Sequence, residues 1–206
     1  MNRKVTLMVL ATLVALPAVA FPQGRGSRNA IGDVQLELVG QFINLTPTSS
    51  QQFGYLTYIN GISGDEPIFS TGPQDETTAL FTFYNDTANE RVISNGPFRI
   101  TNRIGTSTIY LDTAHDGNFS NPDSFRNGIP VQTSTLRQQV VFNTGTGDFT
   151  ATFVNTITSS DFFNLGNHHF VLGKRGQTFR MTFFGHLATL PGHFAGFAVG
   201  PYLTRD

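Results

Sequence analysis

The sequence predicts an all-β fold: an antiparallel meander of roughly eight to ten strands, with a closed β-barrel preferred over a sandwich. Three observations support this. Apolar and polar residues alternate with a period of two, no segment carries a helical stripe, and short Gly/Asn/Asp-rich segments separate the alternating stretches. A sheet this wide would curl or split, and successive hairpins can close it into a barrel without long crossovers.

The alternation is clearest in four segments rich in Thr, Phe and Val, which are 34–38, 79–84, 149–153 and 179–183. In a strand, successive side chains point to opposite faces. Leu36 and Leu38 therefore lie on one face of the strand, and Glu37 lies on the other. We expect half-buried strands with one apolar side at these places.

Turn-forming sequences are expected between the strands, because Gly, Asn and Asp accept the backbone angles of tight turns. Gly96-Pro97 should kink a strand or divide it in two, since proline has no amide hydrogen to donate to a central ladder. The predicted turns are 46–52, 85–90, 102–105, 143–148, 173–177 and 190–193.

The N-terminal segment predicts export. Arg3 and Lys4 precede an apolar run, and Ala18-Val19-Ala20 fits the small-x-small pattern of a cleavage site. A transmembrane anchor is the weaker alternative, because the run is short and Pro17 interrupts it.

We therefore expect a cleaved signal peptide over 1–20, a flexible lead-in over 21–32 and a single all-β domain over 33–206. This organisation predicts a secreted or periplasmic protein. The chain has no cysteine, so its fold must depend on its core and its hydrogen-bonded ladders. That combination favours a bacterial source.

Composition and sequence motifs argue against several classes of binding partner and of catalytic mechanism. The formal net charge is −1 and 13% of the residues are charged, so no basic surface for nucleic acid is expected. Without cysteine the chain offers no thiol nucleophile or thiolate metal site. The sequence contains no G-x-S-x-G, P-loop or dinucleotide fingerprint. These features favour a protein without catalytic activity.

The stretch from Asp112 to about Thr135 shows no convincing alternation and is expected to be a long connection. Long ordered loops in compact domains tend to be lids or binding loops. Phe119 and Phe125 should hold the loop on the body of the protein. We therefore predict a ligand-binding loop with Asp112, Phe119 and Phe125 as its principal residues.

The same loop carries oxygen ligands that suggest calcium. Asp112, Asp116, Asn118 and Asp123 surround an Asp-Gly step, but an EF-hand is excluded because Ala114 stands where a ligand is required and the final carboxylate is too short. A looser calcium cage from these four residues remains a minority alternative. Turn chemistry explains the same residues without a metal.

His186 and His193 flank a predicted turn and could approach each other across a hairpin. A zinc site would need a third ligand, which the sequence does not supply. We interpret both as histidines at the surface near a turn.

An enzyme on the same scaffold is an alternative function. Barrels of the allene-oxide-cyclase and dirigent type guide cyclisation with few polar groups, so a chain without catalytic motifs could still be a cyclase or isomerase. The analogy concerns the fold alone, and no residue is carried over from those families. The polar residues to inspect for a catalytic role are Arg99, Arg103, Tyr110, Asp112 and Arg137.

The C-terminal strands are apolar on both faces, in 181–190 and 193–203. Gly196, Ala198 and Gly200 could face a crowded interior or a ligand cavity while Phe197 and Val199 face another layer. An oligomer interface would explain the same pattern and would suit a structural or assembly subunit, including a homo-oligomer. Insertion of a barrel into a membrane is disfavoured, because the alternation is inconsistent and no aromatic girdle is evident.

The sequence therefore predicts an exported, non-catalytic β-barrel that binds a small apolar ligand or another component of the cell envelope. No cofactor is expected apart from the calcium alternative.

Overall fold

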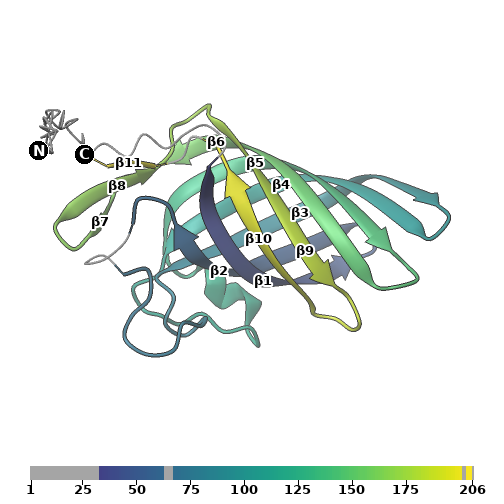
Figure 1. Ribbon diagram of the computed structural model, residues 1–206, viewed down its shortest axis with the longest axis horizontal. Coiled ribbons are helices and arrows are strands. Elements are labelled where there is room, and N and C mark those ends of the chain that lie inside the picture. The colour runs from purple at the N-terminus through teal and green to yellow at the C-terminus, as the bar shows by residue number, and fades with distance from the viewer. Residues whose placement is uncertain (1–32, 63–66, 201–202, 206) are drawn as a thin grey trace, which may run out of the picture.

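The computed structural model describes residues 33–62, 67–200 and 203–205. The chain forms a closed barrel of eight antiparallel strands, in the order β1-β10-β9-β6-β5-β4-β3-β2, and a separate three-stranded sheet (Figure 1). The barrel strands are β1 (Val34–Thr46), β2 (Ser49–Ile59), β3 (Phe81–Asn95), β4 (Phe98–Leu111), β5 (Ile129–Asn143), β6 (Asp148–Ser160), β9 (Thr178–His186) and β10 (Gly192–Val199). The predicted all-β barrel is confirmed. The predicted signal peptide and lead-in lie outside the described residues, among which no helix is long and apolar enough to cross a membrane.

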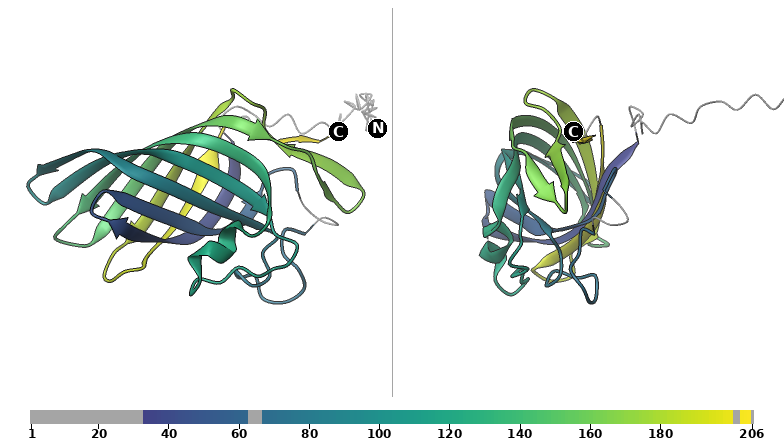
Figure 2. Two further views of the ribbon diagram at one scale, coloured as in Figure 1. Left: turned by 180° about the vertical axis from the view of Figure 1, so that it is seen from behind. Right: turned by 90° about the vertical axis from the view of Figure 1, so that its left-hand side faces the viewer.

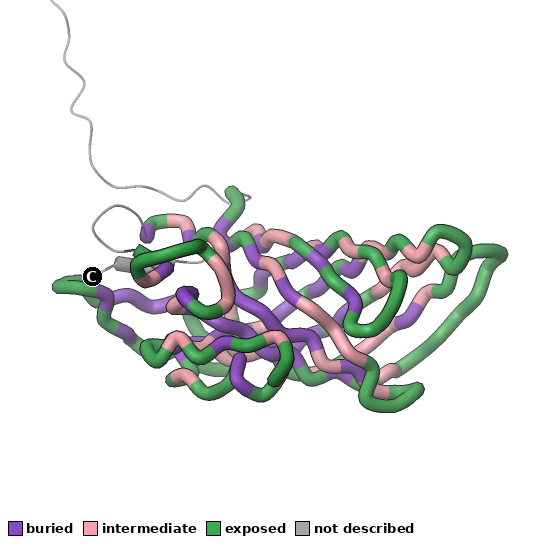
Figure 3. Tube along the Cα trace, turned by 90° about the horizontal axis from the view of Figure 1, so that it is seen from below, coloured by how far each residue is buried: buried purple, intermediate pink, exposed green. Residues whose placement is uncertain are grey.

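The barrel has two different ends. Every tight hairpin of the barrel, β1–β2, β3–β4, β5–β6 and β9–β10, turns at the same end, which we call the hairpin end. The longer connections gather at the opposite end, on the left in Figure 1. Burial follows this division, with buried residues concentrated toward the end with the long connections and exposed residues at the hairpin end (Figure 3).

A short hairpin covers the end with the long connections. It comprises β7 (Phe163–Leu165) and β8 (His168–Leu172), is inserted between β6 and β9, and pairs through β8 with β11 (Leu203–Arg205). We call residues 163–172 the plug hairpin; Figure 2 shows it in front of this end of the barrel. The ring of Phe163 lies 5.3 Å from that of Phe81, and Gln132 Nε2 donates to the carbonyl oxygen of Leu172 at 2.7 Å.

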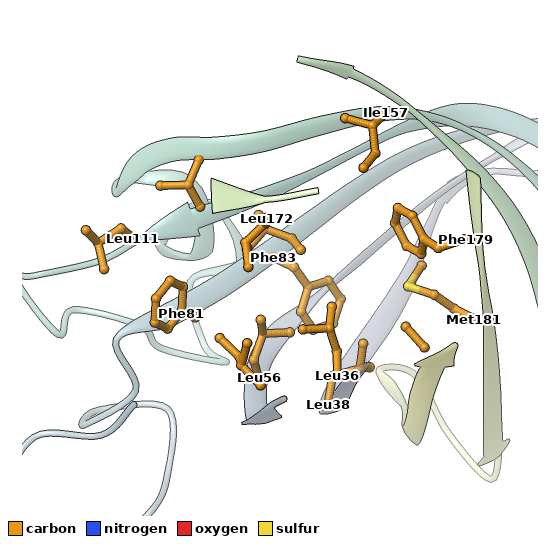
Figure 4. Close-up of a cluster of buried hydrophobic side chains, with 14 of the residues drawn as sticks. Leu36, Leu38, Leu56, Phe81, Phe83, Leu111, Ile157, Leu172, Phe179 and Met181 are labelled. Carbon is orange, nitrogen blue, oxygen red and sulfur yellow. The ribbon is translucent and has the colours of Figure 1, made fainter. Parts of the chain in front are cut away.

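Beneath the plug hairpin, the barrel interior is solid and apolar. Side chains from β1, β2, β3, β6 and β9 meet there, where inward-facing positions alternate with outward-facing ones. Figure 4 shows part of this cluster, with Leu36, Leu38, Leu56, Phe81, Phe83, Leu111, Ile157, Leu172, Phe179 and Met181 labelled. Burial of these side chains is the main source of the barrel's stability.

A second apolar cluster lies outside the barrel wall. Outward-facing Phe53, Tyr55 and Tyr84 are buried there beneath the β2–β3 and β4–β5 connections, to which Phe69 and Phe125 belong. The β4–β5 connection contains the 3₁₀ helix η1 (Pro122–Arg126) and lies below the barrel in Figure 1. Phe125 is fully buried, with its ring 5.5 Å from that of Phe53. This part of the outer wall is therefore core rather than surface.

Two of the predicted turns are wrong. Residues 85–90 lie within β3 and residues 102–105 within β4, and the turn that joins these strands is at Gly96-Pro97. Asn, Asp and Thr in these segments suggested loops, but the inward side of the strands is polar there. Asn85 and Thr87 are buried inside the barrel while Asp86 and Ala88 face solvent. A strand with a polar inner face gives no apolar alternation.

Three of the remaining predicted turns contain observed connections, at 47–48, 144–147 and 173–177, and the turn predicted at 190–193 overlaps the observed connection at 187–191. The backbones of β1 and β2 approach each other closely within the paired part of the two strands. Gly40 lies opposite Gly54, and a Cβ on Gly54 would collide with the backbone of Val39 and Gly40. Only glycine fits where two strands come this close.

Candidate ligand-binding cavity

The half of the barrel near the hairpin end encloses a cavity of about 530 Å³. The turn residues Pro47 and Leu187 lie at its edge, so the cavity is reached from the hairpin end. Its lining comprises Phe42, Asn44, Leu45, Thr46, Pro47, Gln52, Asn89, Arg99, Thr101, Arg103, Gln138, Val140, Phe142, Phe149, Ala151, Phe183, Leu187 and Phe194.

One wall of the cavity is aromatic and is built from β1, β6, β9 and β10. The rings of Phe183 and Phe194 stack with centroids 4.5 Å apart and an interplanar angle of 7°, and the ring of Phe149 meets that of Phe42 edge-on at 5.2 Å. Ala151 leaves room beside these rings. Such pairs are fixed by packing and offer apolar area that need not be ordered on binding.

The facing wall is polar and is built mainly from β3, β4 and β5. Arg103, Thr101 and Arg99 form a row on the inner face of β4, because alternate residues of a strand share a face. Arg103 pairs in register with Asn89 of β3 and Gln138 of β5, and its Nε donates to Asn89 Oδ1 at 2.9 Å. The three side chains thus lie at one level of the cavity.

Amides contribute to the inner surface of the cavity. Asn85 Nδ2 donates to Gln52 Oε1 at 3.2 Å, and Gln52 Nε2 donates in turn to Gln138 Oε1 at 3.1 Å. Since the Gln138 oxygen accepts from Gln52, its amide nitrogen remains as a donor. No acceptor for that nitrogen is found among the described residues.

The cavity is electrostatically positive. Among the residues that the structure describes, Arg99 and Arg103 are the only charged ones in its lining, and none of the lining residues is a carboxylate or a histidine. Burial and, to a smaller extent, the nearby charge of Arg99 together lower the pKa of Arg103 to about 10. Neither guanidinium makes an ion pair with a carboxylate in the part of the chain that the structure describes.

The five polar residues proposed for inspection separate into two groups. Arg99 and Arg103 line the cavity, whereas Tyr110, Asp112 and Arg137 do not. Tyr110 packs against the outer apolar cluster, and Arg137 is exposed on the outer wall, 3.6 Å from Glu90. The structure therefore does not bring the five together.

The loop after β4 does not cover the cavity. Its residues Asp112, Phe119 and Phe125 are absent from the lining, and the two rings pack 4.9 Å apart in the outer cluster. The cavity is reached from the other end of the barrel, so the predicted ligand-binding loop lies away from it. The loop is also shorter than expected, because β5 begins at Ile129; the inward-facing Gln132 and Ser134 hid the alternation of its first residues.

The oxygen atoms of the calcium alternative are engaged within the loop itself. Asp112 is buried and accepts from the backbone amides of Ala114, His115 and Asp116 at 3.0–3.2 Å. Asp116 accepts from Asn127, Asn118 Oδ1 from the amide of Ser120, and Asp123 from Arg126. No group of three or more metal-ligating His, Asp or Glu residues is found among the described residues. Turn chemistry accounts for these side chains.

His186 and His193 are directly opposite each other in the β9–β10 ladder, as their positions beside the turn suggested. His186 Nδ1 lies 2.9 Å from Asp148 Oδ1 on β6, and this contact is the first cause of the lowered pKa of Asp148. Both histidines are exposed. They belong to the rim of the hairpin end and are absent from the cavity lining.

Most of the cavity lining was missed by sequence reasoning. Phe149 was noted only as part of an alternating strand, and Phe42, Phe194, Asn89 and Gln138 were not singled out. One signal was present: Asn, Gln, Thr and Arg recur at inward positions of β3, β4 and β5. A polar inner face on strands of a closed barrel indicates an interior that is not filled by apolar side chains.

A second depression, of about 790 Å³, lies on the outer wall and is lined mainly by residues of β3 to β6, with Leu45 of β1 and Ser49 and Ser50 of β2 at its edge. Ile104 and Val154 provide its apolar surface and Arg137 lies beside them. This depression is larger than the cavity inside the barrel, but its lining comes mostly from outward-facing residues. It is therefore a depression of the surface. The cavity inside the barrel is the better ligand site because side chains surround it.

Comparison with protein family models, curated proteins and solved structures found no match to this chain. The function must therefore be argued from the cavity itself.

Proposed function

We propose that this protein is an exported binding protein that holds a small, largely apolar molecule inside the hairpin end of its barrel. Export is supported by the sequence pattern of residues 1–20. Binding is supported above all by the cavity of about 530 Å³ with a preformed aromatic wall. Cavities that hold small ligands commonly measure roughly 300–1,000 Å³ and are mainly apolar with a few polar groups.

The division of the barrel into two halves also favours binding. Side chains fill the end beneath the plug hairpin, so the empty volume at the other end is not a general property of the barrel. A cavity lined by Phe42, Phe149 and Phe183 leaves apolar surface that a ligand would remove from water. The hairpin turns at its edge provide a route for entry.

The cyclase or isomerase alternative has less support from the same cavity. Proton transfer usually uses a histidine or a carboxylate, and neither occurs among the described residues that line the cavity. The structural-subunit alternative has support of a different kind. Gly196 and Ala198 point into the barrel, and Phe197 and Val199 are half-buried on its outer wall. A stable oligomer in light scattering would favour that role.

Binding can be tested by filling the cavity. Val140 points into it and its neighbour Val141 points outward, so the same substitution at the two positions gives a matched pair. Val140→Trp should weaken the binding of a neutral apolar fluorophore such as N-phenyl-1-naphthylamine by roughly tenfold or more, because the indole occupies the ligand's volume. Val141→Trp should bind the fluorophore like the parent protein.

The measurement is the rise in probe fluorescence on titration of the purified protein, with circular dichroism to verify that both variants are folded. The chain contains no tryptophan, so each variant also carries a single indole whose emission reports energy transfer to the probe. Saturable binding that is equal in both variants would place the probe elsewhere. No saturable binding to the parent protein would contradict the proposal.

A further inference from the structure

We infer that the ligand is an amphipathic anion whose carboxylate or related oxyanion binds Arg103 and Arg99 while its apolar body lies against the aromatic wall. This inference rests on the proposed function and names the class of ligand. It follows from the charges inside the cavity, the hydrogen-bond donors left without acceptors, and the placement of the two walls.

The first step concerns charge. Arg99 and Arg103 stand four residues apart on the inner face of β4, and both line a cavity whose lining contains no carboxylate. The two positive charges repel each other, and Arg103, which is half-buried while Arg99 is exposed, also loses part of its solvation. Such an arrangement is costly unless an anion occupies the site at least part of the time.

The second step concerns hydrogen bonding. Arg103 uses Nε to hold Asn89, which fixes the orientation of its guanidinium, and its two terminal nitrogens have no acceptor among the described residues. The amide nitrogen of Gln138 lies at the same level without an acceptor, and Thr101 adds a hydroxyl between the two arginines. These groups form a set of donors suited to a planar oxyanion, which arginine binds through paired hydrogen bonds.

The third step concerns shape. The donors come from β4 and β5, and the rings of Phe149, Phe183 and Phe194 come from β6, β9 and β10 on the other side of the cavity. A simple inorganic anion would leave the rings in contact with water, and a pure hydrocarbon would leave the guanidinium groups without a partner. A molecule with an apolar body and one anionic group can cover the rings with its body and accept hydrogen bonds from the guanidinium groups with its anionic group.

The charge of the bound ligand can be tested with three molecules of equal chain length, namely dodecanoate, dodecanol and dodecylamine. Calorimetric or probe-displacement titrations at neutral pH should show that the parent protein binds dodecanoate roughly tenfold or more tightly than dodecanol, because charge-assisted hydrogen bonds are among the stronger ones. Dodecylamine, which is cationic, should bind least.

Variants assign that preference to the two arginines. Arg103→Gln should weaken dodecanoate binding by roughly tenfold, the Arg99→Gln/Arg103→Gln double variant should weaken it further, and dodecanol binding should change little. Arg137→Gln is the matched control, because Arg137 is on the adjacent strand but faces outward. It should leave all three affinities unchanged.

The outcomes separate this inference from the proposed function. If dodecanol and dodecanoate bind equally and both are lost in Val140→Trp, the cavity binds apolar molecules and the anionic preference is wrong. If Arg103→Gln weakens both ligands to the same extent, the arginine supports the cavity and does not recognise charge. If neither ligand nor the neutral fluorophore binds, the proposed function itself fails.

Discussion

The charge of Arg103, which the proposed ligand needs, lowers the stability of the ligand-free protein. In the folded protein burial and the charge of Arg99 lower the pKa of Arg103 to about 10, well below the ordinary value of an arginine. The folded state therefore binds this proton less tightly than the unfolded state does. The protonated side chain lowers stability at neutral pH, and the effect shrinks only as the pH rises above about 10.

Arg103→Gln is accordingly expected to raise the melting temperature of the ligand-free protein at pH 7. The side chain is partly exposed, so solvent screening reduces the gain to about 1 kcal/mol, or roughly 2–4 °C for a chain of this size. Arg103→Lys keeps the charge and should give no such gain. Differential scanning calorimetry without ligand measures both, and a lower melting temperature for Arg103→Gln would show that its bond to Asn89 outweighs the electrostatic cost.

At the scale of elements, the plug hairpin explains why the two ends of the barrel differ. Phe163 of β7 and Phe170 of β8 stack with centroids 5.9 Å apart, and Phe163 also meets Phe81 at the start of β3. Both Gln132 Nε2 and Ser160 Oγ donate to the carbonyl oxygen of Leu172. The plug hairpin thus completes the apolar core and is hydrogen-bonded to side chains of β5 and β6.

Adjacent phenylalanines test this role. Phe163 is 6% exposed within the core and Phe162 is 65% exposed beside it. Phe163→Ala should reduce the free energy of unfolding by about 3–5 kcal/mol, because it leaves a cavity where three rings now meet. Phe162→Ala should change it by less than about 0.5 kcal/mol. Chemical denaturation measures both, and similar losses in the two variants would contradict the assignment of the hairpin to the core.

Strand assignment from the sequence succeeded where the barrel interior is apolar and failed where it is polar. Alternation at 149–153 and 179–183 marked β6 and β9, since their inward residues are Phe, Ala and Met. Residues 85–90 and 102–105 resembled turns because both faces of β3 and β4 are polar near the cavity. The polar inner face of β3 and β4 hid these strands in the sequence, and the same polar face identifies the ligand site in the structure.

At the scale of the whole molecule, closure of the barrel decides which residues share the cavity. The sequence indicated Arg99 and Arg103 as polar residues to inspect, but not that they face Phe149 and Phe183 across the interior. That relation depends on the pairing of β1 with β10 and of β6 with β9, which join segments far apart in the chain. The loop at 112–128 was given a functional role from its length, whereas its position on the outer wall could not be deduced from its residues.

The central claim is that an amphipathic anion binds inside the hairpin end of the barrel with its charged group at Arg103. Isotope-filtered NMR of the protein with dodecanoate tests this most directly. The account predicts nuclear Overhauser effects from the alkyl chain to the rings of Phe42 and Phe149, together with a shift of the Arg103 Nε–H resonance on binding. Contacts from the alkyl chain to Ile104 and Val154, on the outer wall, would contradict it.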